Sequence, residues 1–262
     1  MIPKEHIIEW KNTVPWNDFL MVEQDLLISK SLVLIYSDSF LATHLGFRGG
    51  TALHKLYLSP QLRYSEDIDL VQLKAENIGV IIDRLREVLS YLGAPIVKQK
   101  RNNNTLVFKV SSTFNPSISI RLKIEINCKE HFSVLGLNEI PFEVKNSWFN
   151  GSCKIITYHL DELIGTKLRA LYQRKKGRDL FDLFIALRSP TINSENVLKC
   201  YREYMSFSEG SSPSSSLFIL NLEEKIKEEV FLNDIKALLR PTIKYNAIEA
   251  FEFVKSTLIE KI

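Results

Sequence analysis

The segment from Phe47 to Leu70 constrains the fold most, because it places a glycine-rich turn shortly before two closely spaced carboxylates. Three of the 10 glycines in the chain, Gly46, Gly49 and Gly50, lie within five residues there. Glycine permits positive φ and close approach of the backbone to another group. The residues after this turn have a helical pattern, and backbone amides at a helix start bind phosphates. The alternative is a plain turn in which Thr51 caps the helix.

The end of this segment, from Ser65 to Val71, alternates polar and apolar residues and predicts a strand. On a strand, Asp67 and Asp69 point to the same face, while Ile68 and the next apolar residue lie on the opposite, buried face. Like charges on one face repel unless a cation lies between them, and Mg²⁺ prefers oxygen ligands. Asp67 and Asp69 are therefore candidate ligands of one or two Mg²⁺ ions. The alternative is a solvated edge strand with two exposed acids.

The glycine turn, a basic residue in the following helix and the pattern R-x-S-x-D-I-D together resemble a known family. They are similar to the AbiEii/AbiGii-type nucleotidyltransferase toxins of the polymerase-β-like superfamily, over about residues 10–190. The matching residues are Gly49, Gly50, Thr51, Lys55, Arg63, Ser65, Asp67 and Asp69. The resemblance implies that the first six bind the nucleotide and that the two aspartates hold Mg²⁺. Some relatives are silenced when a kinase antitoxin phosphorylates this serine position, which the resemblance places at Ser65 here.

A second polar strand is predicted over residues 118–127, because polar and apolar residues alternate there with period two. Arg121, Lys123 and Glu125 share its polar face. The resemblance implies a third carboxylate on a strand beside the aspartates, where it binds metal or activates the attacking hydroxyl, and Glu125 is the candidate. The alternative is an ordinary polar face on which Glu125 pairs with Lys123 or Arg121.

A helical hairpin is predicted after residue 158, because apolar residues recur at helical spacing on both sides of the Lys175-Lys176-Gly177 turn. Lys167 and Asp182 are expected to meet across it. The pattern K-L-x-A-L followed by R-D-x-x-D-L resembles the third and fourth motifs of the family. This implies that Lys167 contacts the triphosphate and that Asp182 orients it or supports the site. Taken alone, such a pair is a structural bridge of small energetic value.

The predicted fold class is α/β (α+β), with a mixed, nucleotidyltransferase-type β-sheet and flanking helices followed by a helical C-terminal domain. Residues 1–155 form the nucleotidyltransferase domain with its N-terminal helices, and residues 156–262 form a helical domain that completes the active site. Two helices broken at Pro15 are expected over residues 1–45, another over 76–92, and strands near 95–100, 105–112, 118–127 and 141–147. Asn102-Asn103-Asn104 predicts a hairpin turn. Ser206 to Ser216 predicts a flexible loop, and two helices broken at Pro241 are expected after it.

Composition narrows the setting. The chain is 45% hydrophobic and 25% charged, which is typical of a globular protein. It has neither an apolar run of membrane-spanning length nor a secretion signal. The three cysteines are far apart and form no CxxC motif, which argues against zinc and a disulfide scaffold and favours the cytoplasm. The basic clusters suit either phosphate binding or solubility. They comprise Lys98, Lys100 and Arg101 in one, and Arg169, Arg174, Lys175, Lys176 and Arg178 in the other.

The resemblance implies a bacterial toxin from a toxin–antitoxin or phage-defence pair, with a cognate antitoxin. Such an enzyme transfers nucleotides from an NTP to an RNA acceptor with release of pyrophosphate. In some relatives the acceptor is the tRNA 3′ end, and its modification blocks translation. The same chemistry would serve an aminoglycoside, a small cationic acceptor, or a protein side chain. A different class of function is a non-catalytic binding subunit that retains the fold.

Overall fold

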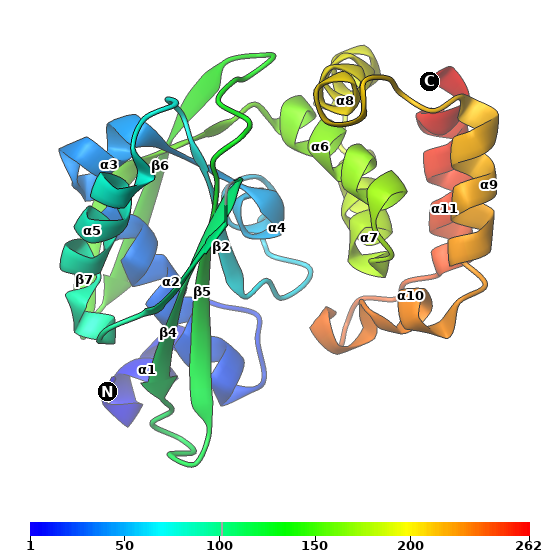
Figure 1. The fold of residues 1–262 in the computed structure, drawn as a ribbon. Coiled ribbons are helices and arrows are strands. Elements are labelled where there is room, and N and C mark those ends of the chain that lie inside the picture. The colour runs from blue at the N-terminus through cyan, green and yellow to red at the C-terminus, as the bar shows by residue number, and fades with distance from the viewer. Residues whose placement is uncertain (101) are drawn as a thin grey trace. The chain divides into compact units, whose positions relative to one another are not determined.

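The computed structural model describes residues 1–100 and 102–262, so Arg101 of the first predicted basic cluster lies outside the described residues. The chain forms two compact units. Residues 1–132 and 137–158 make up the sheet unit, and residues 133–136 and 159–262 make up the helical unit (Figure 1). The predicted boundary after residue 155 falls inside the strand β7 (Phe149–Tyr158).

The sheet unit contains a mixed seven-stranded sheet with the order β3-β4-β5-β2-β1-β7-β6 (Figure 1). Its strands are β1 (Leu45–Arg48), β2 (Asp67–Gln72), β3 (Ile96–Lys100), β4 (Asn103–Ser111), β5 (Ser119–Asn127), β6 (Leu137–Asn146) and β7. The strand β2 lies antiparallel to β1 and parallel to β5. The two strands predicted to carry carboxylates are therefore direct neighbours. The mixed sheet with flanking helices confirms the predicted fold class.

The two faces of this sheet differ because polar and apolar residues alternate along its strands. Ile68 and Leu70 of β2 and Ile124 of β5 are completely buried or nearly so, whereas Asp67 remains partly exposed. The helix α2 (Phe19–Ser37) packs against β5, β6 and β7. Burying an aliphatic side chain contributes about 1.5–3 kcal/mol, so these apolar residues fix which face of each strand turns outward. The carboxylates are consequently held on the open face.

Three helices of the sheet unit begin at polar caps. Asp18, Asp38 and Asn77 accept backbone amide protons at the starts of α2, α3 and α5. The helices are α1 (Lys4–Lys11), α2, α3 (Ser39–His44), α4 (Gly49–Ala52), which continues into a π-helical turn (Leu53–Tyr57), and α5 (Ile78–Val88), which is followed by a 3₁₀ turn (Ser90–Leu92). The predicted break at Pro15 separates α1 from α2. The second break, at Asp38, was not predicted, so residues 1–45 contain three helices instead of two.

The helical unit contains the predicted hairpin, formed by α6 (Leu160–Gln173) and α7 (Gly177–Ala186). Its other helical elements are α8 (Ser194–Glu209), α9 (Ser215–Lys225), α10 (Glu229–Asn233), α11 (Ala247–Thr257) and the 3₁₀ turns Lys236–Leu238 and Ile259–Lys261. The predicted Ser206–Ser216 loop is shorter than expected. The helix α8 continues to Glu209 and α9 begins at Ser215, so only the residues between them lie outside helices. Three helices follow it where two were expected.

Several strand predictions also need correction. The strands β1 and β7 were not predicted, and β6 begins four residues before the predicted start at residue 141. Asn103 and Asn104 belong to β4, since Asn103 pairs with Lys100 across the β3–β4 hairpin. Among the described residues, no helix combines the length and the apolar character needed to cross a membrane.

Candidate active site

The glycine turn packs directly against the carboxylates of β2. Gly49 has a φ of +79°, and a Cβ at this position would collide with Oδ2 of Asp69. A Cβ at Gly50 would lie 2.5 Å from Nη2 of Arg63. Both glycines are therefore needed for close approach, which is the property that also lets a backbone contact a phosphate.

Thr51 ties this turn to the start of β2. Its buried hydroxyl donates to the main-chain oxygen of Asp67, and the hydroxyl of Ser65 lies 2.8 Å from it. Ser65 is therefore next to the turn, although it precedes β2 and does not lie on that strand as predicted. These hydrogen bonds fix the position of the carboxylate-bearing strand relative to the glycines.

Arg63 supports the turn from inside the protein. Its side chain is buried, and Nη1 donates to the main-chain oxygen of Tyr64 at 2.9 Å. The same guanidinium occupies the position that a side chain at Gly50 would need. Arg63 is therefore placed to shape the turn. A contact between Arg63 and the nucleotide stays a prediction of the resemblance.

Lys55 is also directed into the protein. Its buried Nζ lies 2.9 Å from Oδ2 of Asp25 and 3.0 Å from Oγ of Ser29, both on α2. The indole groups of Trp10 and Trp16 donate to the same Asp25 carboxylate. A buried charge is stabilised by such partners, so Lys55 anchors the segment after the turn to α2. The Lys55 ammonium contacts α2 in this structure, and its binding of phosphate stays a prediction.

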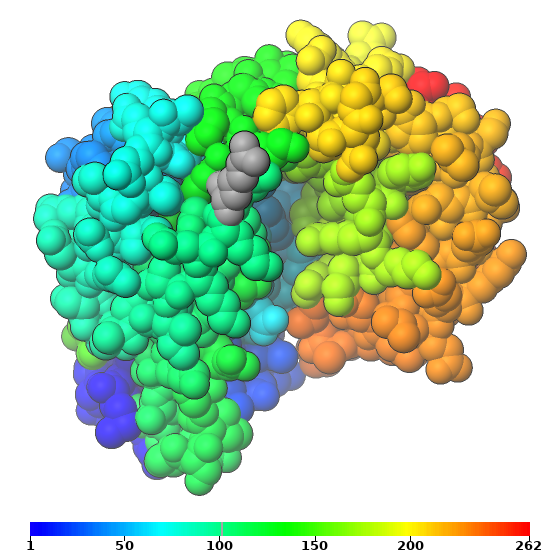
Figure 2. All heavy atoms as spheres, in the orientation of Figure 1, coloured from blue at the N-terminus to red at the C-terminus, as the bar shows by residue number. Residues whose placement is uncertain are grey.

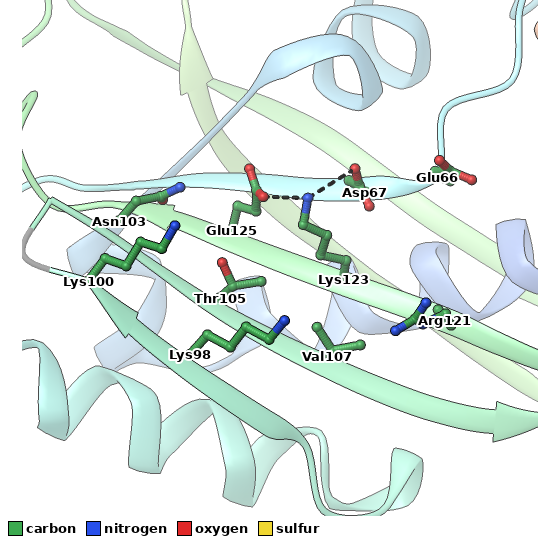
Figure 3. Close-up of a pocket in the computed structure, with 10 residues that line it drawn as sticks. All are labelled: Glu66, Asp67, Lys98, Lys100, Asn103, Thr105, Val107, Arg121, Lys123 and Glu125. Carbon is green, nitrogen blue, oxygen red and sulfur yellow. Dashed lines mark ion pairs between the residues drawn. The ribbon is translucent and has the colours of Figure 1, made fainter.

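A row of charged side chains crosses β2 and β5. Asp69 lies opposite Glu125, and Asp67 lies opposite Lys123. The ammonium of Lys123 pairs with Oε1 of Glu125 and lies 3.8 Å from Oδ2 of Asp67 (Figure 3). Glu125 thus occupies the neighbouring strand that the resemblance requires, and it also makes the ion pair with Lys123 that was the alternative.

The electrostatic environment disfavours a negative charge on Asp67. Burial raises its pKa to about 6; the charge of Lys123 opposes this increase, while the charges of Asp69, Glu66 and Glu125 add to it. Partial burial lowers the pKa of Lys123, but its hydrogen bond to Glu125 and the surrounding carboxylates raise that pKa overall. Several carboxylates therefore share one nearby lysine, and a further cation would relieve their repulsion.

A pocket of about 500 Å³ opens beside this row, on the outward face of β3, β4 and β5. In the view of Figure 2, α5 and the β3–β4 segment form much of the surface of the sheet unit. The residues that line the pocket are Glu66, Asp67, Lys98, Lys100, Asn103, Thr105, Val107, Arg121, Lys123 and Glu125 (Figure 3). The pocket therefore places basic groups next to the carboxylates, as a phosphate-bearing ligand with a bound cation would require.

The carboxylates suit a magnesium ion whose other ligands come from water and substrate phosphates. They do not form a complete metal site by themselves. Among the described residues, no three His, Cys, Asp or Glu side chains are arranged to hold a metal ion. Asp67 and Asp69 nevertheless offer hard oxygen atoms on one strand face. Mg²⁺ is commonly bound by one or two carboxylates, with water and substrate phosphates as the other ligands. The donor set present here matches that pattern.

In the helical unit, Lys167 does meet Asp182 across the α6–α7 hairpin. Its Nζ lies 2.8 Å from Oδ2 of Asp182 and 3.1 Å from Oδ1 of Asp179. Arg174 also pairs with Asp179, at 2.7 and 2.8 Å. Burial raises the pKa of Asp179, but Lys167 and Arg174 outweigh this and lower it overall. Asp179 is not among the site residues predicted from the sequence, although its spacing of three residues from Asp182 places both on one helix face.

A mixed sheet that carries two carboxylates on one strand, with a glycine turn packed against them, is the arrangement expected of the nucleotidyltransferase class. The structure resembles MenT4, a nucleotidyltransferase toxin from Mycobacterium tuberculosis, with a TM-score of 0.68 and 16% identity over 98% of this chain and 88% of that one. It also resembles JHP933 from Helicobacter pylori, with a TM-score of 0.56 and 19% identity over 92% of each chain. A search of curated proteins gives no match.

The family model for the nucleotidyl transferase AbiEii toxin of type IV toxin–antitoxin systems matches residues 32–255. The chain belongs to this family of nucleotidyltransferase toxins. The match confirms the family predicted from the glycine turn and the paired aspartates.

Proposed function

We propose that this toxin transfers nucleotides from an NTP to an RNA acceptor, in a magnesium-dependent reaction that blocks translation. The observation that carries the proposal is the contact between Gly49 and Asp69, in register with Glu125 on the neighbouring strand. Asp67 and Asp69 would hold the ion. When bound, Mg²⁺ neutralises negative charge on the triphosphate as pyrophosphate leaves.

The residues of the chain then have separate tasks. The backbone at Gly49 and Gly50 offers an approach for a phosphate group that any side chain would obstruct. Glu125 accepts the proton of the attacking acceptor hydroxyl, whose oxygen forms a bond to the α-phosphorus while the bond to pyrophosphate breaks. On the family resemblance, Lys167 and Asp182 remain proposed residues for the triphosphate.

The charge of the pocket supports a polyanionic acceptor. Lys98, Lys100 and Arg121 line the pocket together with Lys123. Basic side chains attract RNA phosphates, whereas a cationic aminoglycoside would require an acidic pocket. We propose that the acceptor is the tRNA 3′ end and that the protein acts in the cytoplasm, where NTPs and RNA are both present. We also propose that it has a cognate antitoxin and a role in phage defence.

Labelled nucleotides test this proposal directly. The purified protein is incubated with each α-labelled NTP and Mg²⁺ in the presence of total RNA, protein or an aminoglycoside. We expect label in RNA, loss of labelling in Asp69→Asn, and dependence on Mg²⁺ that EDTA removes. Label in the protein or aminoglycoside pool would replace the RNA acceptor. No incorporation under any condition would favour the non-catalytic alternative.

A charge variant tests the acceptor surface separately. The double change Lys98→Glu and Lys100→Glu should weaken RNA binding and reduce its salt dependence by about one phosphate contact for each lysine. The matched control is Lys145→Glu on β6, an exposed lysine outside the pocket. Equal RNA binding by the double variant and the control would show that RNA does not use this pocket.

A further inference from the structure

The position of Lys123 has a consequence for metal binding. Its ammonium lies between the carboxylates of Asp67 and Glu125 (Figure 3). The side chains of Lys123, Asp67 and Glu125 are 37%, 34% and 30% exposed, respectively. The register of β2 and β5 imposes this arrangement, because Lys123 lies directly opposite Asp67 and Glu125 opposite Asp69. Solvent, and therefore a dissolved ion, has access to the same oxygen atoms.

An ammonium group and Mg²⁺ compete for these oxygen atoms. Both are hard cations, and two positive groups a few ångströms apart repel each other. In the arrangement described, Lys123 already satisfies Glu125 and faces Asp67, and the described residues contain no preassembled group of three metal-binding side chains. A metal ion bound to Asp67 would therefore lie close to the Lys123 ammonium, and the repulsion between the two charges favours movement of Lys123.

We propose that Lys123 is a tethered countercharge that occupies the metal position in the nucleotide-free protein and is displaced when metal and nucleotide bind. This inference rests on the proposed function, because it takes Asp67 and Asp69 as the metal-binding residues. Lysine has a flexible four-carbon stem, so the displaced ammonium can move to a phosphate in the adjoining pocket. The protein thereby disfavours free metal and favours metal that arrives with a triphosphate, which supplies both extra metal ligands and a new partner for Lys123.

Metal titration without nucleotide provides the test. Mn²⁺ serves as the probe, and its dissociation constant is measured by electron paramagnetic resonance and calorimetry at fixed ionic strength. The proteins are the full-length wild type, Lys123→Met and the control Lys109→Met. Lys109 lies on β4, opposite Arg121 of β5. This control therefore removes a lysine of the same sheet and leaves the ion pair between Lys123 and Glu125 in place. We expect Lys123→Met to bind Mn²⁺ about tenfold more tightly, given the repulsion between close charges, and Lys109→Met to stay within about twofold of wild type.

A second titration adds a non-hydrolysable NTP analogue. In the wild type, the analogue should tighten Mn²⁺ binding strongly, and this enhancement should be smaller in Lys123→Met. Lys123→Gln provides an independent replacement with the same expectation. Unchanged or weaker Mn²⁺ binding in both variants would overturn the inference. If Asp67→Asn binds Mn²⁺ as wild type does, the proposed metal site itself is wrong. If Asp67→Asn abolishes binding while the Lys123 variants leave it unchanged, only the countercharge role is lost.

Discussion

Asp67 combines a proposed role in metal binding with a cost to stability. Burial is the main cause of the raised pKa of its carboxylate, and the charges of the neighbouring acids add to this increase while Lys123 opposes it. We expect Asp67→Asn to abolish nucleotide transfer while raising the free energy of unfolding by about 0.5–1 kcal/mol at neutral pH, since active-site charges are often destabilising. Urea denaturation and the labelling assay measure both effects. The control Glu143→Gln, at an exposed site on β6, should alter neither, and wild-type transfer by Asp67→Asn would show that the metal site is misassigned.

The same residue gives a pH dependence of defined sign. The folded-state pKa of Asp67, about 6, lies above the ordinary value for aspartate of about 3.9. Between these values the native protein binds this proton more tightly than the unfolded chain does, so its stability falls as pH rises. The stability advantage of Asp67→Asn should therefore be absent near pH 4 and complete above about pH 6. Urea unfolding across this range checks it, and an advantage that grows toward acid pH would contradict the assigned environment.

Substitution of Gly49 tests whether its close contact with Asp69 matters, apart from the effect of backbone strain. Gly49 and Gly136 both have positive φ, at +79° and +86°, but only at Gly49 would a Cβ meet another group. Each change to alanine incurs backbone strain of about 1–3 kcal/mol. Gly49→Ala must also displace Asp69, so it should lose more stability and eliminate transfer. Folded Gly136→Ala should retain transfer. Comparable activity in both variants would mean that the contact with Asp69 has no role in the reaction.

At the scale of elements, the α6–α7 hairpin is held by a buried charge cluster. The small energetic value expected for an exposed Lys–Asp bridge does not apply, because Lys167 is only 8% exposed and both of its carboxylate partners are fully buried. Removing one member of a buried pair typically costs about 3–5 kcal/mol. Lys167→Ala should therefore lower stability by about this amount, whereas Lys175→Ala, which breaks an exposed pair with Glu228, should cost less than about 1 kcal/mol.

This stability loss shapes the test of function for Lys167. Transfer must be measured per folded molecule, at a temperature where denaturation curves show the variant to be native. Loss of transfer in that folded fraction would support a role on the triphosphate. Full transfer per folded molecule would assign Lys167 to the hairpin alone.

The elements that could be predicted are those with a local signal. Alternation identified β2 and β5 and fixed the face of Asp67, Asp69 and Glu125, because a period of two determines side-chain direction. By contrast, β1 has only four residues, three of them buried, and β7 is interrupted by Gly151. Neither shows alternation strong enough to predict a strand, and both depend on their neighbours in the sheet.

Side-chain partners were less predictable than faces. Lys55 lies on the segment after the glycine turn, but its partner Asp25 comes from a helix thirty positions earlier in the chain. No local pattern links the two residues, so the basic residue was assigned to phosphate by resemblance. The position of Lys123 between two carboxylates likewise depends on strand register, which the tertiary structure sets.

At the scale of the whole molecule, the division into units is not a single cut in the chain. Residues 133–136 belong to the helical unit although β6 and β7 follow them in the sheet unit. The buried carboxylate of Glu162 explains this, since it accepts hydrogen bonds from Ser133, from the amides of Val134 and Leu135, and from the hydroxyl of Tyr204. A buried carboxylate needs several donors, and here a loop supplies most of them.

The activity of the whole protein can be tested in a bacterial host. Because the family consists of nucleotidyltransferase toxins, induced expression of the wild type should arrest growth. Asp69→Asn should abolish the arrest, since it removes a proposed metal-binding carboxylate, while the control Glu143→Gln should arrest growth as the wild type does. Viable counts measure the effect, immunoblots establish equal expression, and sequencing of RNA 3′ ends detects added nucleotides. Growth arrest by Asp69→Asn at wild-type strength would show that toxicity does not depend on nucleotide transfer. Growth arrest only in the variants that add 3′ nucleotides would show that transfer causes the toxicity.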